Sequence, residues 1–171
     1  MKMKRFVALL FACCLSLSLA TTSFAIEKVP LIPEDQITRA STVPTTHKNL
    51  GAGPYVGELV DLAPTKASLT RYYFTTGTGK INMEFDLERS GTTTSATRVL
   101  RVYLYEKTGE NASWRQKGGS TTVSFSGSGI NTTRSFTGLN PDYFYYLKFA
   151  NESNAEVDSR WDISGEIIIS E

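Results

Sequence analysis

The chain has little cysteine and little histidine, and each scarcity excludes a kind of chemistry. Among 171 residues there are two cysteines and one histidine. Both cysteines, Cys13 and Cys14, lie in the amino-terminal segment, so the rest of the chain has no disulfide, no cysteine nucleophile and none of the usual zinc sites. The single His47 leaves nucleophilic triads without their customary base, because its position in a proline- and threonine-rich stretch predicts an exposed linker residue.

The first 25 residues predict a signal for export. Three basic residues at positions 2, 4 and 5 precede an apolar run over residues 6–20, and residues 21–25 then supply the small side chains of a cleavage site. The run is shorter than the roughly 20 residues of a membrane-spanning helix. We therefore predict cleavage after Ala25 and secretion from a bacterial cell. An alternative interpretation is a weak lipobox over residues 10–13, which would make Cys13 a lipid anchor.

The remaining chain lacks an excess of positive charge. Removal of the first 25 residues leaves 146, with 15 basic residues against 17 acidic ones and a balance of −2. A slightly acidic chain is a poor candidate for binding nucleic acid or an anionic membrane. A chain of this length suits one domain with a substantial core.

Proline is scarce except in one stretch. Residues 26–54 contain four of the six prolines, at positions 30, 33, 44 and 54. Proline at this density breaks helices and removes backbone donors, so we expect a linker or loosely held arm, which could still lie along the domain as an edge segment. The folded domain is then expected over residues 55–171.

The domain has no stretch with a helical period, and its apolar residues alternate instead. Ile81, Met83, Phe85 and Leu87 form the cleanest example of a strand with one buried face. Eight strands are expected, over residues 56–62, 69–76, 81–87, 100–105, 121–125, 131–136, 143–149 and 161–169. Glycine-rich turns separate them, so we predict an all-β, antiparallel β-sandwich of the jelly-roll or Greek-key kind.

The aromatic residues outside the predicted core are the strongest candidates for binding. Their positions alternate with the apolar ones, so that neighbouring strands would place their rings on one outer face. Exposed aromatic rings can stack on sugars or anchor a protein partner, although such rings can equally form cross-strand pairs that stabilise the sheet, or be covered by the arm. The candidate ligand-binding residues are Tyr73, Tyr103, Tyr105, Phe144, Tyr146 and, from a loop, Trp114.

Carboxylates are the other candidates. Glu84, Asp86 and Glu88 share one strand face about 7 Å apart, a spacing that inverting glycosidases use, but alternating acids are also what a solvated strand face contains. No metal site or cofactor is predicted, with calcium as the one candidate. Its ligands would come from Glu152, Asn154, Glu156, Asp158 and Asp162, joined by Asp61 if the first and last strands pair.

Two motifs resemble known β-sandwich modules. Residues 139–145 have the L-x-P-x-x-x-Y spacing of fibronectin type III domains, in which the tyrosine, here Tyr145, turns a corner and hydrogen-bonds back to the backbone. Residues 56–170 resemble the bacterial pre-peptidase C-terminal domain, in residues 72–74, 77–79, 80–87, 102–105, 143–150 and 164–170. The chain departs from that family at residues 95–97, where Ser-Ala-Thr replaces an acidic turn, and it contains no protease.

These patterns lead to an expected function. The resemblance and the short proline-rich arm, which is similar to small secreted proteins of Gram-positive bacteria, imply a non-catalytic extracellular module. We expect a secreted module that binds an extracellular glycan, cell-wall polymer or surface protein. The alternatives are a structural or adhesion protein that assembles through sheet edges and, third, a carboxylate-based glycoside hydrolase.

Overall fold

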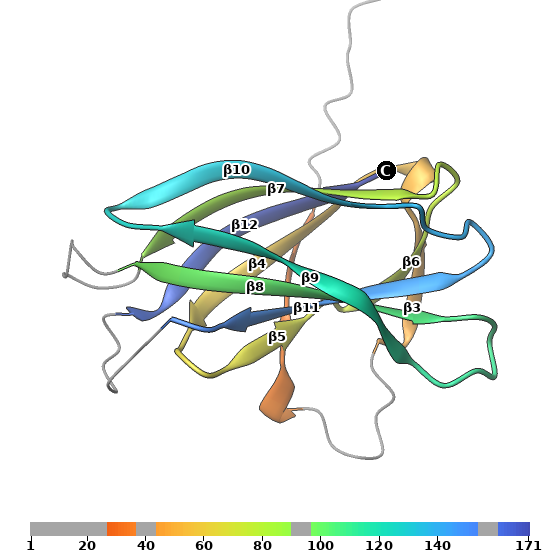
Figure 1. Cartoon of the computed structure of the whole chain (residues 1–171), viewed down its shortest axis with the longest axis horizontal. Helices are drawn as coiled ribbons and strands as arrows, with labels where there is room; N and C mark the ends of the chain where they lie inside the picture. Colours follow the sequence, from red (N-terminus) through yellow and green to blue (C-terminus); the bar gives the residue numbers. More distant parts are fainter. Residues whose placement is uncertain (1–26, 37–43, 90–96, 154–160) are drawn as a thin grey trace, which may run out of the picture.

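The computed structural model describes residues 27–36, 44–89, 97–153 and 161–171, and these residues form an all-β structure (Figure 1). The predicted β-sandwich is confirmed: two mostly antiparallel sheets pack against each other. The described residues form twelve strands instead of about eight. Three of the additional strands come from the proline-rich arm, and the fourth arises because the expected strand over residues 69–76 divides into two.

The first sheet, sheet A, has five strands. Their order across the sheet is β1 (Lys28–Pro30), β4 (Tyr55–Leu62), β12 (Ile163–Ser170), β7 (Lys80–Arg89) and β10 (Gly129–Thr137). Strand β1 runs parallel to β4, and the other neighbours are antiparallel.

The second sheet, sheet B, has seven strands built around β11 (Phe144–Asn151). One edge of β11 pairs with β8 (Arg98–Lys107), which pairs in turn with β9 (Arg115–Phe125). The other edge of β11 pairs with two short strands, β5 (Ala67–Leu69) and β6 (Tyr72–Thr75). The outermost strands are β2 (Ile32–Pro33) beside β5 and β3 (Thr46–Asn49) beside β6.

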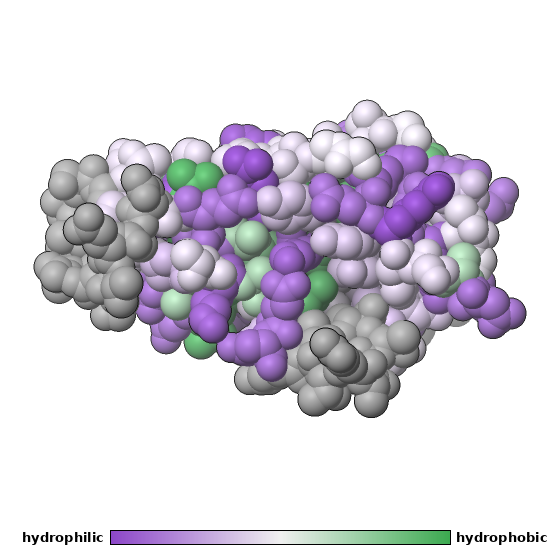
Figure 2. All heavy atoms as spheres, turned by 60° about the horizontal axis from the view of Figure 1, so that its bottom comes forward, coloured by the Kyte–Doolittle hydropathy of each residue, from purple (hydrophilic) through white to green (hydrophobic). Residues whose placement is uncertain are grey.

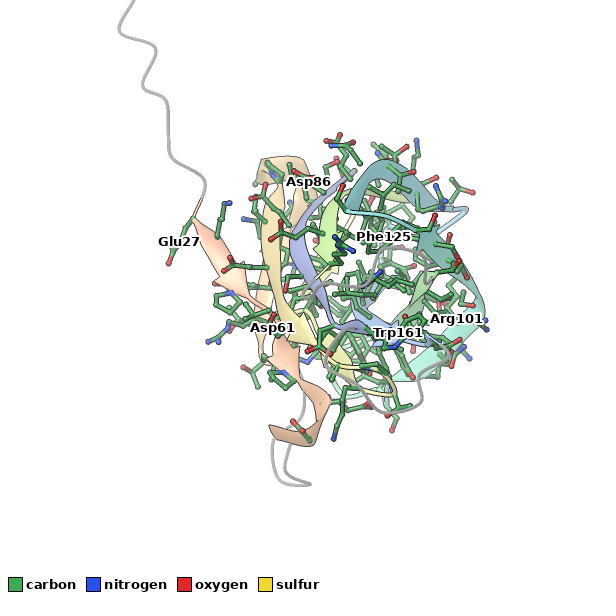
Figure 3. The ribbon with its side chains drawn as sticks, turned by 90° about the vertical axis from the view of Figure 1, so that its left-hand side faces the viewer. Glu27, Asp61, Asp86, Arg101, Phe125 and Trp161 are labelled. Atoms are coloured by element: carbon green, nitrogen blue, oxygen red, sulfur yellow. The ribbon has the colours of Figure 1, made fainter. Side chains whose placement is uncertain are left out.

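The core lies between the sheets and follows the predicted alternation. In β7 every second side chain, from Ile81 to Leu87, is almost completely buried, while the acidic residues between them are exposed. Strands β8, β11 and β12 repeat the pattern with Leu100, Val102, Leu104, Tyr145, Leu147, Phe149, Ile163, Ile167 and Ile169. Figure 3 looks at the sandwich from the side, with Asp61 and Arg101 on opposite sides of these packed side chains. The pleat thus fixes which residues face outward on each sheet.

The proline-rich arm docks on the sandwich as an edge segment. Its first strand extends sheet A, and the next two extend sheet B, with the short 3₁₀ turns η1 (Glu34–Gln36) and η2 (Leu50–Ala52) after β2 and β3. Leu31 and Leu50 anchor the arm, since both are buried in the core. The arm therefore covers the edges of β4, β5 and β6, and the prolines in β1 and β2 limit further pairing there.

The predicted corner at Tyr145 is present. The Tyr145 hydroxyl donates a hydrogen bond of 2.9 Å to the Asn140 carbonyl and accepts one of 2.8 Å from the Asn140 backbone N–H. Burial raises the pKa of this tyrosine, and its hydrogen bond to the Asn140 backbone partly offsets the shift. The corner fixes the loop that leads into β11 and so helps to set the position of Phe144 at the start of that strand.

Candidate functional site

The outward face of sheet B gathers most of the predicted aromatic residues. Strands β8 and β11 are neighbours, and their register places Tyr105 opposite Tyr146 and Lys107 opposite Phe144. All four alternate with core residues and therefore point away from the core. The two tyrosine-rich strands thus lie side by side.

Six side chains form a continuous group on this face, which we call the ring cluster: His47, Tyr73, Tyr105, Trp114, Phe144 and Tyr146. The Tyr105 and Tyr146 rings stack with 4.7 Å between centroids and an interplanar angle of 5°. Trp114 meets the Tyr146 ring nearly edge-on at 4.7 Å. Stacked and edge-on arrangements at these distances are the favourable geometries for aromatic pairs.

The second half of the ring cluster is centred on Tyr73 in β6. Its ring lies 5.3 Å from Phe144 in an edge-on arrangement and 6.1 Å from Trp114. The His47 ring stacks on the Tyr73 ring with 5.2 Å between centroids, and its Nε2 lies 3.0 Å from the Thr75 hydroxyl oxygen. Trp114 is held near both halves by the β8–β9 loop, in which the Ala112 N–H closes a turn onto the Gly109 carbonyl.

The ring cluster is half-buried and does not form a flat, fully exposed platform. Tyr146 is only 9% exposed, and Tyr73, Tyr105, Trp114 and Phe144 have intermediate exposure. Burial, with a smaller contribution from Tyr105, raises the pKa of Tyr146 well above its ordinary value. The rings therefore stabilise the sheet by packing on one another, and they also present edges and partial faces to solvent.

The prediction that Tyr103 belongs with the other rings is wrong. Tyr103 has no ring contact with another described residue. It lies two residues before Tyr105 on β8, where its cross-strand partner is Lys148. Its hydroxyl instead donates a hydrogen bond of 2.6 Å to Glu152, which also pairs with Arg101 at 2.8 Å. The bond to Glu152 raises the pKa of Tyr103.

Lys107 is central to the ring cluster, although the sequence analysis did not single it out. Its ammonium nitrogen lies 4.8 Å from the Tyr73 ring centroid, 5.0 Å from Phe144 and 5.1 Å from Trp114. Three ring faces within about 6 Å attract a cation through their negative quadrupoles. Lys107 has the same strand parity as Tyr103 and Tyr105, and this parity was the signal that could have identified it.

His47 was predicted to be an exposed linker residue, and only the exposure is correct. It lies in strand β3, which pairs in parallel with β6 and places His47 beside Tyr73. The proline-rich composition of the arm hid this strand, because its pairing depends on β6 and on the buried Leu50, not on a local pattern.

A groove of about 630 Å³ borders the ring cluster. Its walls come from the arm, from β6, from the end of β8 and from the β8–β9 loop, and its lining includes Thr45, Tyr73, Lys107, Glu110, Asn111, Ser113 and Trp114. A second hollow of about 350 Å³ lies farther along the same sheet, lined by residues such as Tyr103, Tyr105, Gln116 and Lys148. Tyr105 thus connects the ring cluster to the second hollow. On the face seen in Figure 2, hydrophobic surface appears only as small separate patches among polar side chains.

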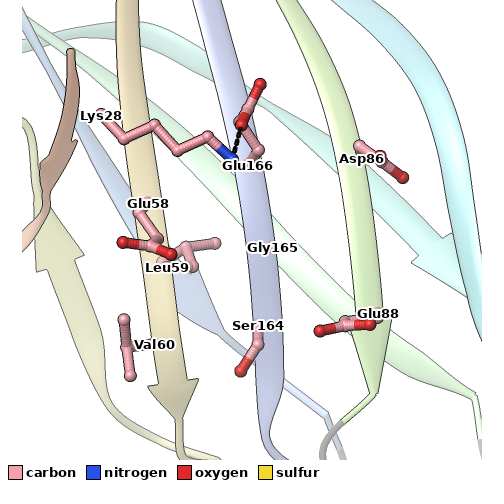
Figure 4. Close-up of a pocket in the computed structure, with 9 residues that line it drawn as sticks. All are labelled: Lys28, Glu58, Leu59, Val60, Asp86, Glu88, Ser164, Gly165 and Glu166. Atoms are coloured by element: carbon pink, nitrogen blue, oxygen red, sulfur yellow. Dashed lines mark ion pairs between the residues drawn. The ribbon is translucent and has the colours of Figure 1, made fainter.

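The outward face of sheet A has a different chemistry. Glu84, Asp86 and Glu88 are exposed there, as predicted for alternate residues of a half-buried strand. The register places Glu166 between Glu58 and Asp86 on three adjacent strands. Figure 4 shows Lys28 reaching over β4 to Glu166, with 2.5 Å between the ammonium and carboxylate atoms. The residues drawn in Figure 4 line an open hollow of about 360 Å³, and most of the charged side chains in its lining are acidic.

The calcium prediction receives no geometric support from the described residues. Within residues 27–36, 44–89, 97–153 and 161–171, no three acidic or histidine side chains converge as a metal site. Strands β4 and β12 do pair, but Asp61 is hydrogen-bonded to Ser164, and Glu152 is engaged by Arg101 and Tyr103. Asn154, Glu156 and Asp158 lie outside the described residues.

In the described part of the chain, no helix has the length and apolarity needed to cross a membrane.

Comparison with known proteins yields no assignment. No protein-family model matches the sequence, and a search of curated proteins finds no significant match.

Proposed function

We propose that this protein is a secreted, non-catalytic β-sandwich module that binds an extracellular polymer, with a glycan or cell-wall polysaccharide as the favoured ligand. The observation that carries the proposal is the ring cluster beside the groove at Thr45, Trp114 and Lys107. Secretion is supported by the export pattern in the first 25 residues.

The composition of the groove favours a sugar over a purely apolar ligand. Tyr73 and Trp114 offer apolar ring surface, while Thr45, Asn111 and Ser113 offer hydroxyl and amide groups. Binding sites commonly combine aromatic surface with a few polar groups that fix the orientation of the ligand. Sugar rings present both kinds of surface, because apolar C–H faces alternate with hydroxyl groups around their edges.

Co-sedimentation tests this proposal. The purified protein would be mixed with Gram-positive cell walls and insoluble polysaccharides, beside a Trp114→Ala variant and an Asp86→Ala variant from the opposite sheet. We expect the unaltered protein and the Asp86→Ala variant to sediment, and the Trp114→Ala variant to remain in solution. Equal sedimentation of all three proteins would exclude the ring cluster as the binding site.

A second candidate is assembly through sheet edges. The arm covers the edges of β4, β5 and β6, but β9 and β10 remain edge strands of 11 and 9 residues. One hydrogen bond connects these two strands: the Nε–H of Arg134 in β10 donates to the Thr122 carbonyl of β9 at 3.0 Å. Sedimentation velocity at high protein concentration distinguishes the candidates, since edge assembly requires oligomers and polymer recognition does not.

A further inference from the structure

The ammonium group of Lys107 has different partners from the other cationic groups on sheet B. Five other cations on or beside sheet B pair with carboxylates among the described residues: Lys66 with Asp35, Arg101 with Glu152, Arg115 and Lys117 with Glu106, and Lys148 with Glu34. Among the described residues, Lys107 has no carboxylate within 4 Å. Its partners are three ring faces and the Glu110 carbonyl, at 3.4 Å.

This arrangement leaves Lys107 with hydrogen-bonding capacity on the groove side. An ammonium group has three N–H donors and no acceptor. One donor is directed to the long contact with Glu110, and the rings attract the charge without neutralising it. The side chain is half-buried, and it lines the groove together with Trp114 and Tyr73. Partial burial also weakens solvent screening of any ion pair formed there.

The groove also contains one opposing charge. Glu110 is exposed at the β8–β9 loop, and its carboxylate disfavours a second negative group nearby. Because exposed charges are well screened by water and salt, this effect is smaller than that of the half-buried Lys107.

We propose that the groove selects a carboxylate-bearing sugar. The sugar ring would pack against Trp114 and Tyr73, and its carboxylate would accept a hydrogen bond from the Lys107 ammonium group. A carboxylate fits better than a phosphate monoester, since a single ammonium balances one negative charge and a phosphate monoester carries about −1.5 to −2 at neutral pH. This inference rests on the proposed function and adds to it the class of ligand.

A matched pair of ligands isolates the role of charge. Soluble polygalacturonate and its fully methyl-esterified form have the same sugar ring, and only the first carries carboxylates. Affinities would be measured by calorimetry at low and moderate salt for the unaltered protein and for four variants: Lys107→Gln, Lys107→Arg, Glu110→Gln and Trp114→Ala. Circular dichroism would confirm that each variant is folded.

We expect the unaltered protein to bind the acidic polymer about fivefold more tightly than the ester, the ratio that an ion pair of about 1 kcal/mol supplies. The Lys107→Gln variant should lose this preference, so that the acid and the ester bind with equal affinity, while Lys107→Arg retains the preference. The Glu110→Gln variant should strengthen binding of the acidic form only, and the Trp114→Ala variant should weaken both forms. Added salt should reduce only the binding of the acidic form.

Two results would overturn the inference and leave the proposed function standing. The first is equal affinity for acid and ester with both lost in Trp114→Ala. The second is binding of neither form by a protein that still sediments with cell walls in a Trp114-dependent manner. A folded protein that sediments with no wall or polysaccharide would overturn the proposed function itself.

Discussion

The outer faces of the two sheets arise from the same strand alternation, yet their side chains are arranged in opposite ways. On sheet A, the acidic residues of β7 are exposed, and like charges on β4, β12 and β7 lie in register. On sheet B, the rings of β6, β8 and β11 pack on one another around Lys107. An alternating pattern therefore predicts which residues point outward, but not whether they become a solvated surface or a packed one.

The difference has a physical cause in the side chains themselves. Carboxylates on neighbouring strands repel one another and gain most from contact with water, so they remain apart and exposed. Aromatic rings gain from mutual contact and from partial removal from water, so neighbouring strands bring them together. We infer that sheet B is the face suited to recognition.

The largest expected difference between the faces is in stability. Truncation of Tyr146 to alanine removes a ring that stacks on Tyr105 and contacts Trp114, which should cost about 3 kcal/mol of the free energy of unfolding. The matched Asp86→Ala change on sheet A should alter stability by less than about 0.5 kcal/mol. Urea denaturation measures both values, and similar losses in the two variants would contradict the comparison.

The next largest expected effect is a loss of stability at alkaline pH, which depends on the buried tyrosines. Burial raises the pKa of Tyr55 to about 12 and also raises those of Tyr145 and Tyr146. Since these hydroxyls ionise more readily in the unfolded chain, their contribution is complete below about pH 10 and is lost as pH rises toward the folded values. Tyr55 should therefore lower stability by about 1.4 kcal/mol per pH unit between about pH 10 and about pH 12, and ionisation of Tyr145 and Tyr146 should lower it in the same direction.

The Tyr146→Phe variant isolates the part of this slope that comes from Tyr146 in the ring cluster. Denaturation between pH 8 and pH 11 should show a shallower decline than in the unaltered protein, while Asp86→Asn keeps the original slope. An unchanged slope in Tyr146→Phe would mean that this hydroxyl is not buried in the folded state.

Ligand binding should separate the faces by about tenfold. The Trp114→Ala variant should lose at least that much affinity for the bound polymer, because stacking on an aromatic ring commonly contributes more than 1 kcal/mol. A Glu84→Ala, Asp86→Ala double variant on sheet A should bind normally. We also expect glycoside turnover at the background level in both the unaltered protein and the double variant. Turnover by the unaltered protein that the double variant lacks would favour the carboxylate hydrolase.

The smallest expected effect is a gain in stability on sheet A. Asp86 lies directly opposite Glu166, and Glu166 lies directly opposite Glu58, so the Asp86→Asn change removes a repulsion between neighbouring strands. We expect the free energy of unfolding to increase by about 0.2–0.5 kcal/mol at low salt, because the Lys28 ammonium beside Glu166 offsets part of the repulsion, and by less at high salt. Thermal unfolding at two salt concentrations measures it, and a decrease at low salt would show that Asp86 has a favourable partner.

The sequence predicted the features that depend on local periodicity. The alternation in residues 81–87 identified the buried face of β7, and the spacing before Tyr145 identified the corner. Outward parity also identified Tyr105, Phe144 and Tyr146. Features that depend on contacts between distant segments were not predicted, as the place of His47 beside Tyr73 shows.

The prediction of the ring cluster was wrong at one residue, Tyr103, for a specific reason. Parity treats Tyr103 and Tyr105 alike, but the cross-strand partner of Tyr103 is Lys148 and that of Tyr105 is Tyr146. Parity gives the face of a residue, whereas register gives its neighbours. The register requires the turn lengths and the long-range pairing of β8 with β11, and no short motif encodes these.

The docked arm has a consequence for the order of folding. The ring cluster takes His47 from the arm, Tyr73 from β6, Trp114 from a hairpin loop and Phe144 from β11, and thus from segments distributed over most of the described chain. Such nonlocal contacts form slowly, since each requires the closure of a long loop. The groove is therefore complete only once the parallel pairing of β3 with β6 has joined the arm to the rest. A time-resolved fluorescence signal from Trp114 would then record the moment at which the groove is complete.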